Sequence, residues 1–126
     1  KIVVISRDSS SGTFGVWKDL VMKKERVIPS ALTVPSNGGI VQAVGKTPGA
    51  IGYVGLGYLT KEIKAVKVEG VVGSEENTLN GSFPISRGLF MFTKGWPQGD
   101  TMAFISFILS KKGQALVKEA GSIPVH

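Results

Sequence analysis

The chain alternates short apolar runs with segments in which apolar residues recur at helical spacing. The first run, Ile2-Val3-Val4-Ile5, is β-branched throughout and predicts a strand that is buried on both faces. It is followed by Phe14, Trp17 and Val21, which fall on one face of a helix and predict an amphipathic helix over residues 14–24. The polar residues between them therefore form a strand-to-helix connection.

Two further strand-like runs continue this alternation. Residues 32–34 predict a second strand that ends at Pro35, and residues 50–54 predict a third strand with little polar character, which we expect in the centre of the sheet. Between these strands, Ser36-Asn37-Gly38 supplies a helix cap ahead of the apolar positions 40–44. The order β-α-β-α-β predicts an α/β fold with a mostly parallel sheet flanked by helices.

The C-terminal half gives weaker signals. Residues 63–69 alternate apolar and charged side chains and predict a half-exposed edge strand or hairpin arm, and Glu75-Glu76 predicts the start of a short helical turn. Residues 83–93 form a long, largely apolar run that we expect to be extended.

Two helices are predicted after this run. We expect Asp100 to cap the first and Ser110 to end it and cap the second, which stops at Gly121. The expected apolar stripe of the first helix consists of Ala103, Phe104, Phe107 and Ile108.

The composition excludes several kinds of catalytic and metal-binding site. The 126 residues contain no Cys, and the single His126 is the last residue, which excludes disulfides, thiol catalysis, His-based triads and zinc sites of ordinary spacing. We expect no metal site and no cofactor. The formal net charge of +6 favours an anionic partner, but the basic residues are scattered and are not interleaved with aromatic ones, unlike a nucleic-acid surface. No apolar run approaches the length of about 18 residues that spans a membrane.

The strand-to-helix connection carries the most suggestive chemistry. It reads Ser6-Arg7-Asp8-Ser9-Ser10-Ser11-Gly12-Thr13 and ends where the predicted helix begins. The first N–H groups of a helix have no intrahelical acceptor and lie at the positive end of the helix dipole, so they form an anion site. Hydroxyl donors, a glycine and the forked cation of Arg7 suit that site. The alternative is that one serine caps the helix and the rest is a polar loop.

Two other glycine-rich features follow in the sequence. The cap at Ser36 could face the same ligand cleft, or it could only begin a helix. The stretch Gly39 to Thr47 has five residues between its first glycine and Gly-Lys-Thr, whereas a nucleotide-binding P-loop has four, and Pro48 follows where a helix should begin. We therefore reject a nucleotide site.

The motif Arg-x-x-x-Ser-Gly-Thr after a strand resembles the second-lobe phosphate motif of periplasmic phosphate-binding proteins, the solute receptors of phosphate ABC importers. Two further stretches are similar to that family in the same order. One runs from Val34 through Asn37-Gly-Gly and Thr47-Pro-Gly-Ala-Ile-Gly-Tyr to Tyr58. The other begins with Phe83-Pro-Ile-Ser-Arg and continues over residues 103–110 and 113–114. The resemblance covers nearly the whole chain.

This resemblance implies one lobe of a type II periplasmic binding protein, located in the periplasm or at the cell surface. It implies that Arg7, Ser11, Gly12 and Thr13 bind inorganic phosphate. We expect Asp8, Ser9, Ser10 and Asn37 to lie next to these ligands and to support them. Residues 1–82 would be the core of the ligand lobe, and residues 83–126 the return strand and C-terminal helices.

The sequence departs from the family in two respects. Some members carry a carboxylate two residues after the arginine, where this chain has Ser9, while Asp8 directly follows Arg7. A carboxylate can accept a hydrogen bond from protonated phosphate and repels sulfate, which has no proton to give at neutral pH. Without that carboxylate, sulfate stays open as a ligand. Family members are also about twice this length, so we expect a fragment of a two-lobe protein.

The partners implied are inorganic phosphate, the missing first lobe, and an ABC transporter permease. We expect the isolated lobe to self-associate through the apolar run 83–93. An enzyme using the same anion cradle for phosphate esters is the alternative. It would need a base near Ser11 or a carboxylate-bound metal, and the nine acidic residues are scattered, so we expect no enzyme.

Overall fold

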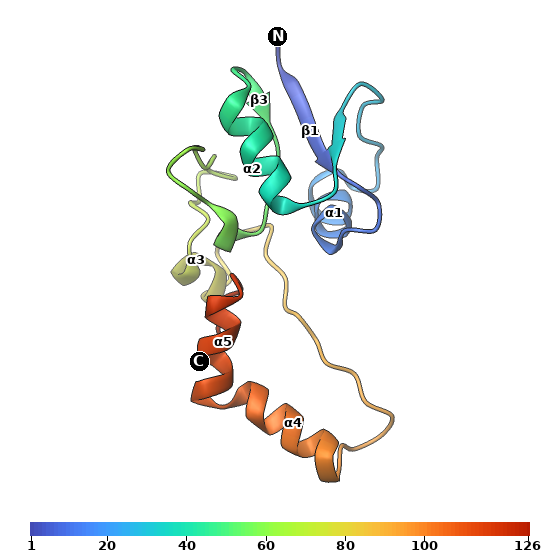
Figure 1. Cartoon of the computed structure of the whole chain (residues 1–126), viewed down its shortest axis with the longest axis vertical. Coiled ribbons are helices and arrows are strands. Elements are labelled where there is room, and N and C mark those ends of the chain that lie inside the picture. Colours follow the sequence, from blue (N-terminus) through green and yellow to red (C-terminus); the bar gives the residue numbers. More distant parts are fainter. The chain divides into compact units, whose positions relative to one another are not determined.

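The computed structural model describes all 126 residues and divides into two compact units, Lys1–Ser86 and Arg87–His126. The helices and strands are shown in Figure 1. The first unit contains β1 (Val3–Arg7), α1 (Gly12–Val16), η1 (Trp17–Val21), β2 (Leu32–Val34), α2 (Asn37–Lys46), β3 (Ala50–Ile51), η2 (Leu56–Tyr58) and α3 (Glu75–Leu79). The second unit contains α4 (Gly99–Leu109) and α5 (Lys111–Glu119). The predicted division at residue 82 concerns the intact protein and stays a prediction.

The first unit is built on a three-stranded parallel sheet in the order β2-β1-β3. The α/β fold with a parallel sheet is therefore confirmed. β1 lies in the middle, and its Ile5 is only 1% exposed. The prediction that residues 50–54 form the central strand is wrong, because β3 is an edge strand and ends at Ile51.

Helix α2 contacts all three strands and buries Ile40 and Val41. The approach is close at Gly52, directly after β3. A Cβ there would lie 2.8 Å from Cγ2 of Ile40 and 3.3 Å from the carbonyl oxygen of Ile5. Only glycine fits between the helix and the central strand at this point.

The first helical segment begins earlier and ends earlier than the spacing predicts. α1 starts at Gly12 with Ser11 as its cap, and η1 continues it as a π-helical turn to Val21. Lys23 and Lys24 then adopt positive φ angles of 48° and 69°, which no continuing helix allows. The helical periodicity is confirmed, but its last turn is not helical.

The segment between the sheet and the second unit is mostly irregular. No strand forms over residues 63–69, where an edge strand or hairpin arm was predicted. The pairing there is one isolated antiparallel bridge between Val68 and Val71 across a turn. The short helix predicted at Glu75 is confirmed as α3, and the Ser74 hydroxyl accepts a hydrogen bond from the N–H of Asn77 at 3.1 Å.

In the second unit, residues 87–93 run as an extended chain that pairs with no strand (Figure 1), and Phe92 is 91% exposed. The prediction that residues 83–93 are extended is wrong at residues 83–85, which form a bend and a turn. Ser110 ends α4 and caps α5, as predicted, by accepting a hydrogen bond from the N–H of Gly113 at 3.2 Å. Asp100 lies inside the first turn of α4 and not at its cap. All four residues of the predicted apolar stripe lie in α4, and nothing in this chain covers Phe104 and Phe107, which are 61% and 41% exposed.

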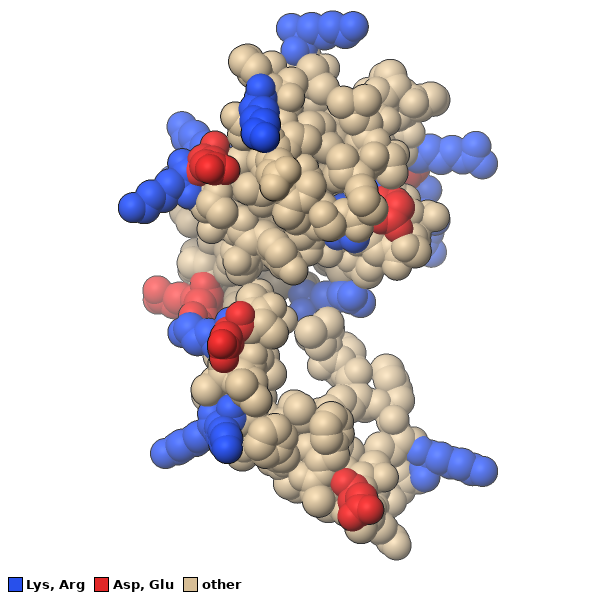
Figure 2. Space-filling view, viewed as in Figure 1, with Lys and Arg blue, Asp and Glu red and all other residues tan.

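Charged side chains are spread over both units. Figure 2 shows Lys and Arg as separate side chains and not as one patch. No helix of the chain is long and apolar enough to cross a lipid bilayer.

Candidate anion-binding site

The candidate site lies where β1 passes into α1. The hydroxyl oxygen of Ser11 accepts a hydrogen bond from the N–H of Phe14 at 3.3 Å, and its carbonyl accepts one from Gly15 at 3.1 Å. Ser11 is therefore the N-cap, as one of the two alternatives held. This role leaves its hydroxyl proton free to donate. The N–H groups of Gly12 and Thr13 lie in the first turn, where a helix offers no acceptor, so the cap and an anion are compatible.

Arg7 is the last residue of β1, and its side chain is 12% exposed. Its NH1 group donates to Oδ1 of Asn37 at 2.7 Å, and its NH2 group donates to the carbonyl of Pro35 at 3.1 Å. Its Nε is buried and has no hydrogen-bond partner. An unpaired buried donor on a cation is unfavourable, and no acceptor of this chain satisfies this N–H.

Asp8 holds the turn that follows. Oδ1 accepts hydrogen bonds from the Ser10 hydroxyl and from the Ser10 N–H, the latter at 3.1 Å, while Oδ2 lies 3.7 Å from NH2 of Arg7. The Ser10 hydroxyl is the main cause that lowers the pKa of Asp8 below its ordinary value. Asp8 is therefore held as a carboxylate by the loop itself.

The second glycine-rich turn reaches the same edge of the sheet. β1 and β2 are parallel and pair Arg7 with Val34, so both strands end side by side. Ser36 caps α2 by accepting a hydrogen bond from Gly39 at 3.0 Å, which places Asn37 beside the guanidinium. Asn37 thus joins the residues predicted from the first motif.

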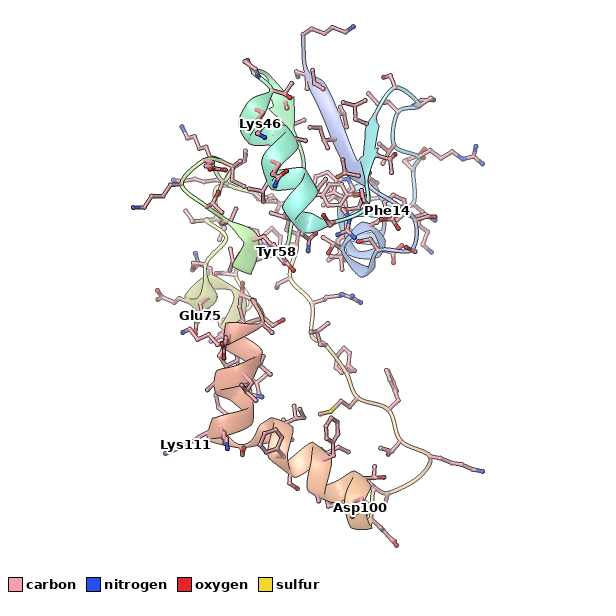
Figure 3. All side chains as sticks on the ribbon, viewed as in Figure 1. Phe14, Lys46, Tyr58, Glu75, Asp100 and Lys111 are labelled. Atoms are coloured by element: carbon pink, nitrogen blue, oxygen red, sulfur yellow. The ribbon has the colours of Figure 1, made fainter.

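The structure distributes the other predicted residues unevenly. Ser9 and Ser10 are exposed, Gly12 is exposed, and Thr13 is half-buried. Ser9 makes no side-chain hydrogen bond, so its predicted supporting role has no observed contact. By contrast, Lys46 lies at the C-terminal end of α2, away from Phe14 and the start of α1 (Figure 3), which agrees with the rejection of a P-loop.

Tyr53 is a residue that sequence reasoning missed. Its hydroxyl lies 2.8 Å from Oγ of Ser6 and accepts a hydrogen bond from the backbone N–H of Arg7 at 3.1 Å. Its ring stacks on Trp17, with centroids 4.6 Å apart and planes 5° apart. The sequence offered only a tyrosine inside a predicted apolar strand, and its contacts depend on tertiary structure.

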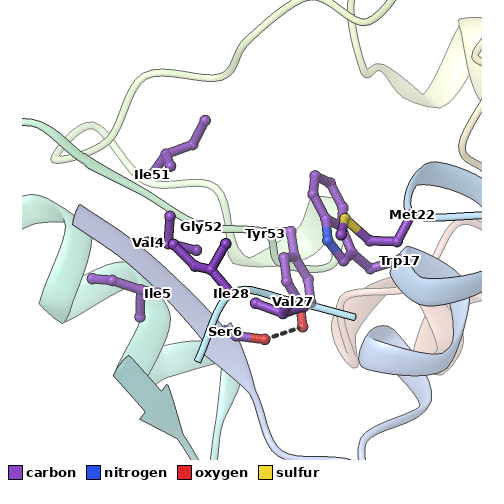
Figure 4. A pocket seen from close by; sticks show the side chains of 10 residues that line it. All are labelled: Val4, Ile5, Ser6, Trp17, Met22, Val27, Ile28, Ile51, Gly52 and Tyr53. Carbon is purple, nitrogen blue, oxygen red and sulfur yellow. Dashed lines mark hydrogen bonds between the residues drawn. The ribbon is translucent and has the colours of Figure 1, made fainter. Parts of the chain in front are cut away.

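An apolar cavity of about 230 Å³ lies beside this stack (Figure 4). It is lined by Val4, Ile5, Ser6, Trp17, Met22, Val27, Ile28, Ile51, Gly52 and Tyr53. No charged residue and none of the predicted phosphate ligands line it, so it is separate from the candidate anion site. No three His, Asp or Glu side chains gather to hold a metal ion.

The fold and site define the class of protein. Residues 1–112 match the family model of the PBP superfamily domain. The chain belongs to that family.

Its relatives carry more specific names. The chain is 34% identical to the phosphate-binding protein PstS of Pseudomonas aeruginosa over 98% of its own length, and 35% identical to PstS 2 of Streptococcus pneumoniae over 94%. It spans 42% and 43% of these two proteins. Less than half of the length of these curated relatives is therefore represented.

Solved structures agree with this assignment. A substrate-binding protein assigned to a phosphate ABC transporter of Clostridium perfringens, solved with bound phosphate, superposes with a TM-score of 0.82 at 35% identity. A phosphate-binding protein of a Streptococcus pneumoniae phosphate ABC transporter gives 0.80 at 30%. In both cases 99% of this chain covers 52% of the solved chain.

Proposed function

We propose that this chain binds inorganic phosphate as part of the solute-binding protein of a phosphate ABC transporter. The observation that carries the proposal is the Arg7 guanidinium, which is fixed by Asn37 and Pro35 yet keeps a buried Nε–H without a partner. The near full-length similarity to phosphate-binding proteins supports phosphate as the anion.

The proposed ligands are Arg7, the hydroxyl of Ser11, and the N–H groups of Gly12 and Thr13. Neutral donors and one arginine suit a dehydrated oxyanion, because each hydrogen bond to a charged group is worth about 1.5–3 kcal/mol. Asn37 and Asp8 support this set by holding the guanidinium and the turn.

We propose that this part of the site does not by itself distinguish phosphate from sulfate. Discrimination needs an acceptor for the phosphate proton. In Asp8, Oδ1 accepts two hydrogen bonds from Ser10, and Oδ2 lies 3.7 Å from NH2 of Arg7, where it faces the cation. The hydrogen bond from the Ser10 hydroxyl also lowers the pKa of Asp8, which makes its carboxylate a weak base, so we propose binding and not phosphate-ester chemistry.

The proposed partners rest on the lengths and the names of the relatives. We propose that residues outside this chain supply the facing wall of the site, and that the complete protein works outside the cytoplasm with an ABC permease. The exposed apolar side chains of Leu89, Phe90 and Phe92 support the further proposal that the chain studied alone self-associates, which light scattering at increasing concentration measures.

Isothermal titration of the 126-residue chain with phosphate tests the function. We expect saturable binding that Arg7→Ala weakens by about 1.5–3 kcal/mol, the worth of one charge-assisted contact. Arg26→Ala is the matched control, because Arg26 is exposed and its substitution removes the same charge at another place on the chain. Equal effects of the two substitutions would contradict a site at Arg7 and indicate general charge attraction.

A further inference from the structure

We propose that Tyr53 is a positioning residue that holds Arg7 and the start of α1 in register for phosphate. The inference rests on the proposed function and adds a residue to which sequence motifs assign no chemistry. The inference rests on two contacts of Tyr53: its hydroxyl bonds to the backbone of Arg7, and its ring stacks on Trp17.

The hydroxyl of Tyr53 takes the place of a strand at Arg7. β3 ends at Ile51, two residues before Tyr53, so the sheet offers no β3 partner opposite the end of β1. The Arg7 N–H donates to the Tyr53 hydroxyl at 3.1 Å instead. The backbone of Arg7 is thereby fixed on this side by a side chain and not by a strand ladder.

The Ser6 hydroxyl contacts both the Arg7 carbonyl and the Tyr53 hydroxyl. It donates to the carbonyl of Arg7 at 3.2 Å and lies 2.8 Å from the Tyr53 hydroxyl. With Ser6 donating to Arg7, Tyr53 donates to Ser6 and accepts from the Arg7 N–H. Every hydroxyl proton then has an acceptor, as a nearly buried polar group such as Ser6, only 4% exposed, requires.

The ring of Tyr53 reaches the helical side of the site. It stacks on Trp17, whose backbone N–H bonds to the carbonyls of Thr13 and Phe14. Thr13 is one of the proposed phosphate ligands, so the stack lies one helical turn from the anion. Figure 4 shows the Tyr53 ring between Trp17 and Ser6, with its hydroxyl directed at Ser6.

The position of Tyr53 depends on Gly52. Successive residues of an extended chain point to opposite faces, so a residue pressed against α2 leaves its neighbour to face Trp17. Gly52 is that residue, since its missing Cβ would collide with Ile40. The Arg7 side chain is held by Asn37 of α2 and points to the face of the sheet that α2 covers. Tyr53 contacts the Arg7 backbone from the opposite face.

The test compares Tyr53→Phe with Tyr58→Phe in the full 126-residue chain. Tyr53→Phe keeps the stacking ring and removes only the hydroxyl, whereas Tyr58→Phe removes the same group from a side chain that is 44% exposed. Phosphate affinity is measured by titration, in the wild-type background and with Arg7→Ala. We expect Tyr53→Phe to weaken binding about threefold to tenfold, as loss of one hydrogen bond does, and Tyr58→Phe to leave it unchanged.

The Arg7→Ala background separates positioning from general stability. If Tyr53 acts through Arg7, Tyr53→Phe should have little further effect once the guanidinium is gone. NMR without ligand adds a second readout: the Arg7 N–H and Nε–H signals should move in Tyr53→Phe and not in Tyr58→Phe. Ser6→Ala, which removes the other end of the hydroxyl pair, should weaken binding in the same direction and serves if Tyr53→Phe fails to fold.

Unchanged affinity in Tyr53→Phe would overturn the inference alone, and so would an equal loss with and without Arg7, because that result indicates a purely structural role. A wild-type chain that binds no phosphate would overturn the proposed function and this inference with it.

Discussion

The guanidinium of Arg7 and the side-chain oxygen of Asn37 are joined by a hydrogen bond of 2.7 Å across 30 positions of sequence. The bond connects the end of the central strand to the first residue of α2. It fixes the direction of a cation that is 12% exposed. Two turns that are separate in the sequence thus form one site.

Removing this bond should weaken phosphate binding without unfolding the chain. Asn37→Ala leaves NH1 of Arg7 without its partner, so the guanidinium becomes free to turn away from the loop. We expect a loss of about 1 kcal/mol, or about fivefold, in phosphate affinity by titration. Gln42→Ala is the control, because Gln42 is an exposed amide on the same helix. If both variants bind like the wild type, Asn37 does not orient Arg7.

The pKa of Asp8 reports on the loop itself. Hydrogen bonds from Ser10 favour the carboxylate and lower its pKa in the folded chain. Their contribution to stability is present above the ordinary pKa of 3.8 and is lost as the pH falls through the lowered folded-state value. A carboxyl NMR titration should therefore place Asp8 below 3.8, and Ser10→Ala should raise it.

Ser9→Ala provides the matched control for this titration. Ser9 is an exposed neighbouring hydroxyl that makes no bond to Asp8, so its removal should leave the pKa of Asp8 where it is in the wild type. A pKa of Asp8 at or above 3.8 in the wild-type chain would contradict the loop geometry.

Gly52 should tolerate no side chain. In Gly52→Ala the new Cβ would lie 2.8 Å from Cγ2 of Ile40, so the helix or strand must move. We expect a destabilisation of about 1–3 kcal/mol, typical of overpacking, in urea unfolding followed by circular dichroism. Gly15→Ala is the control, since its Cβ in α1 would meet nothing within 4 Å and should stabilise the helix by up to about 1 kcal/mol. Equal stability of Gly52→Ala and the wild type would show that α2 packs less closely than described.

The fold class and the location of the candidate site could be predicted from the sequence, because both depend on short-range signals. The β-branched run before Arg7 and the Ser11 cap are both short-range signals, and the structure has them where they were predicted. Asn37 was a candidate because it follows a cap at a neighbouring strand end. Those inferences need only the rule that parallel strands end at one edge.

Other features were beyond local pattern. Alternation over residues 63–69 has no strand beside it to pair with, so it forms no strand. Periodicity in α4 identified apolar residues but not what covers them, and Phe104 stays exposed. The role of Tyr53 could not be predicted from the sequence, because it depends on two tertiary features. β3 ends at Ile51, and Gly52 allows the close approach to Ile40.

The central claim is that phosphate binds at the junction of β1 and α1. An NMR titration of the 126-residue chain with phosphate, following the N–H signals of Gly12 and Thr13 and the Nε–H of Arg7, tests it most directly. One wall of a site leaves the anion partly hydrated, so we predict saturable shifts at these groups with a dissociation constant of roughly 1 mM, about 4 kcal/mol. Shifts that never saturate, or that appear at scattered lysines while these three groups stay unchanged, would contradict the account.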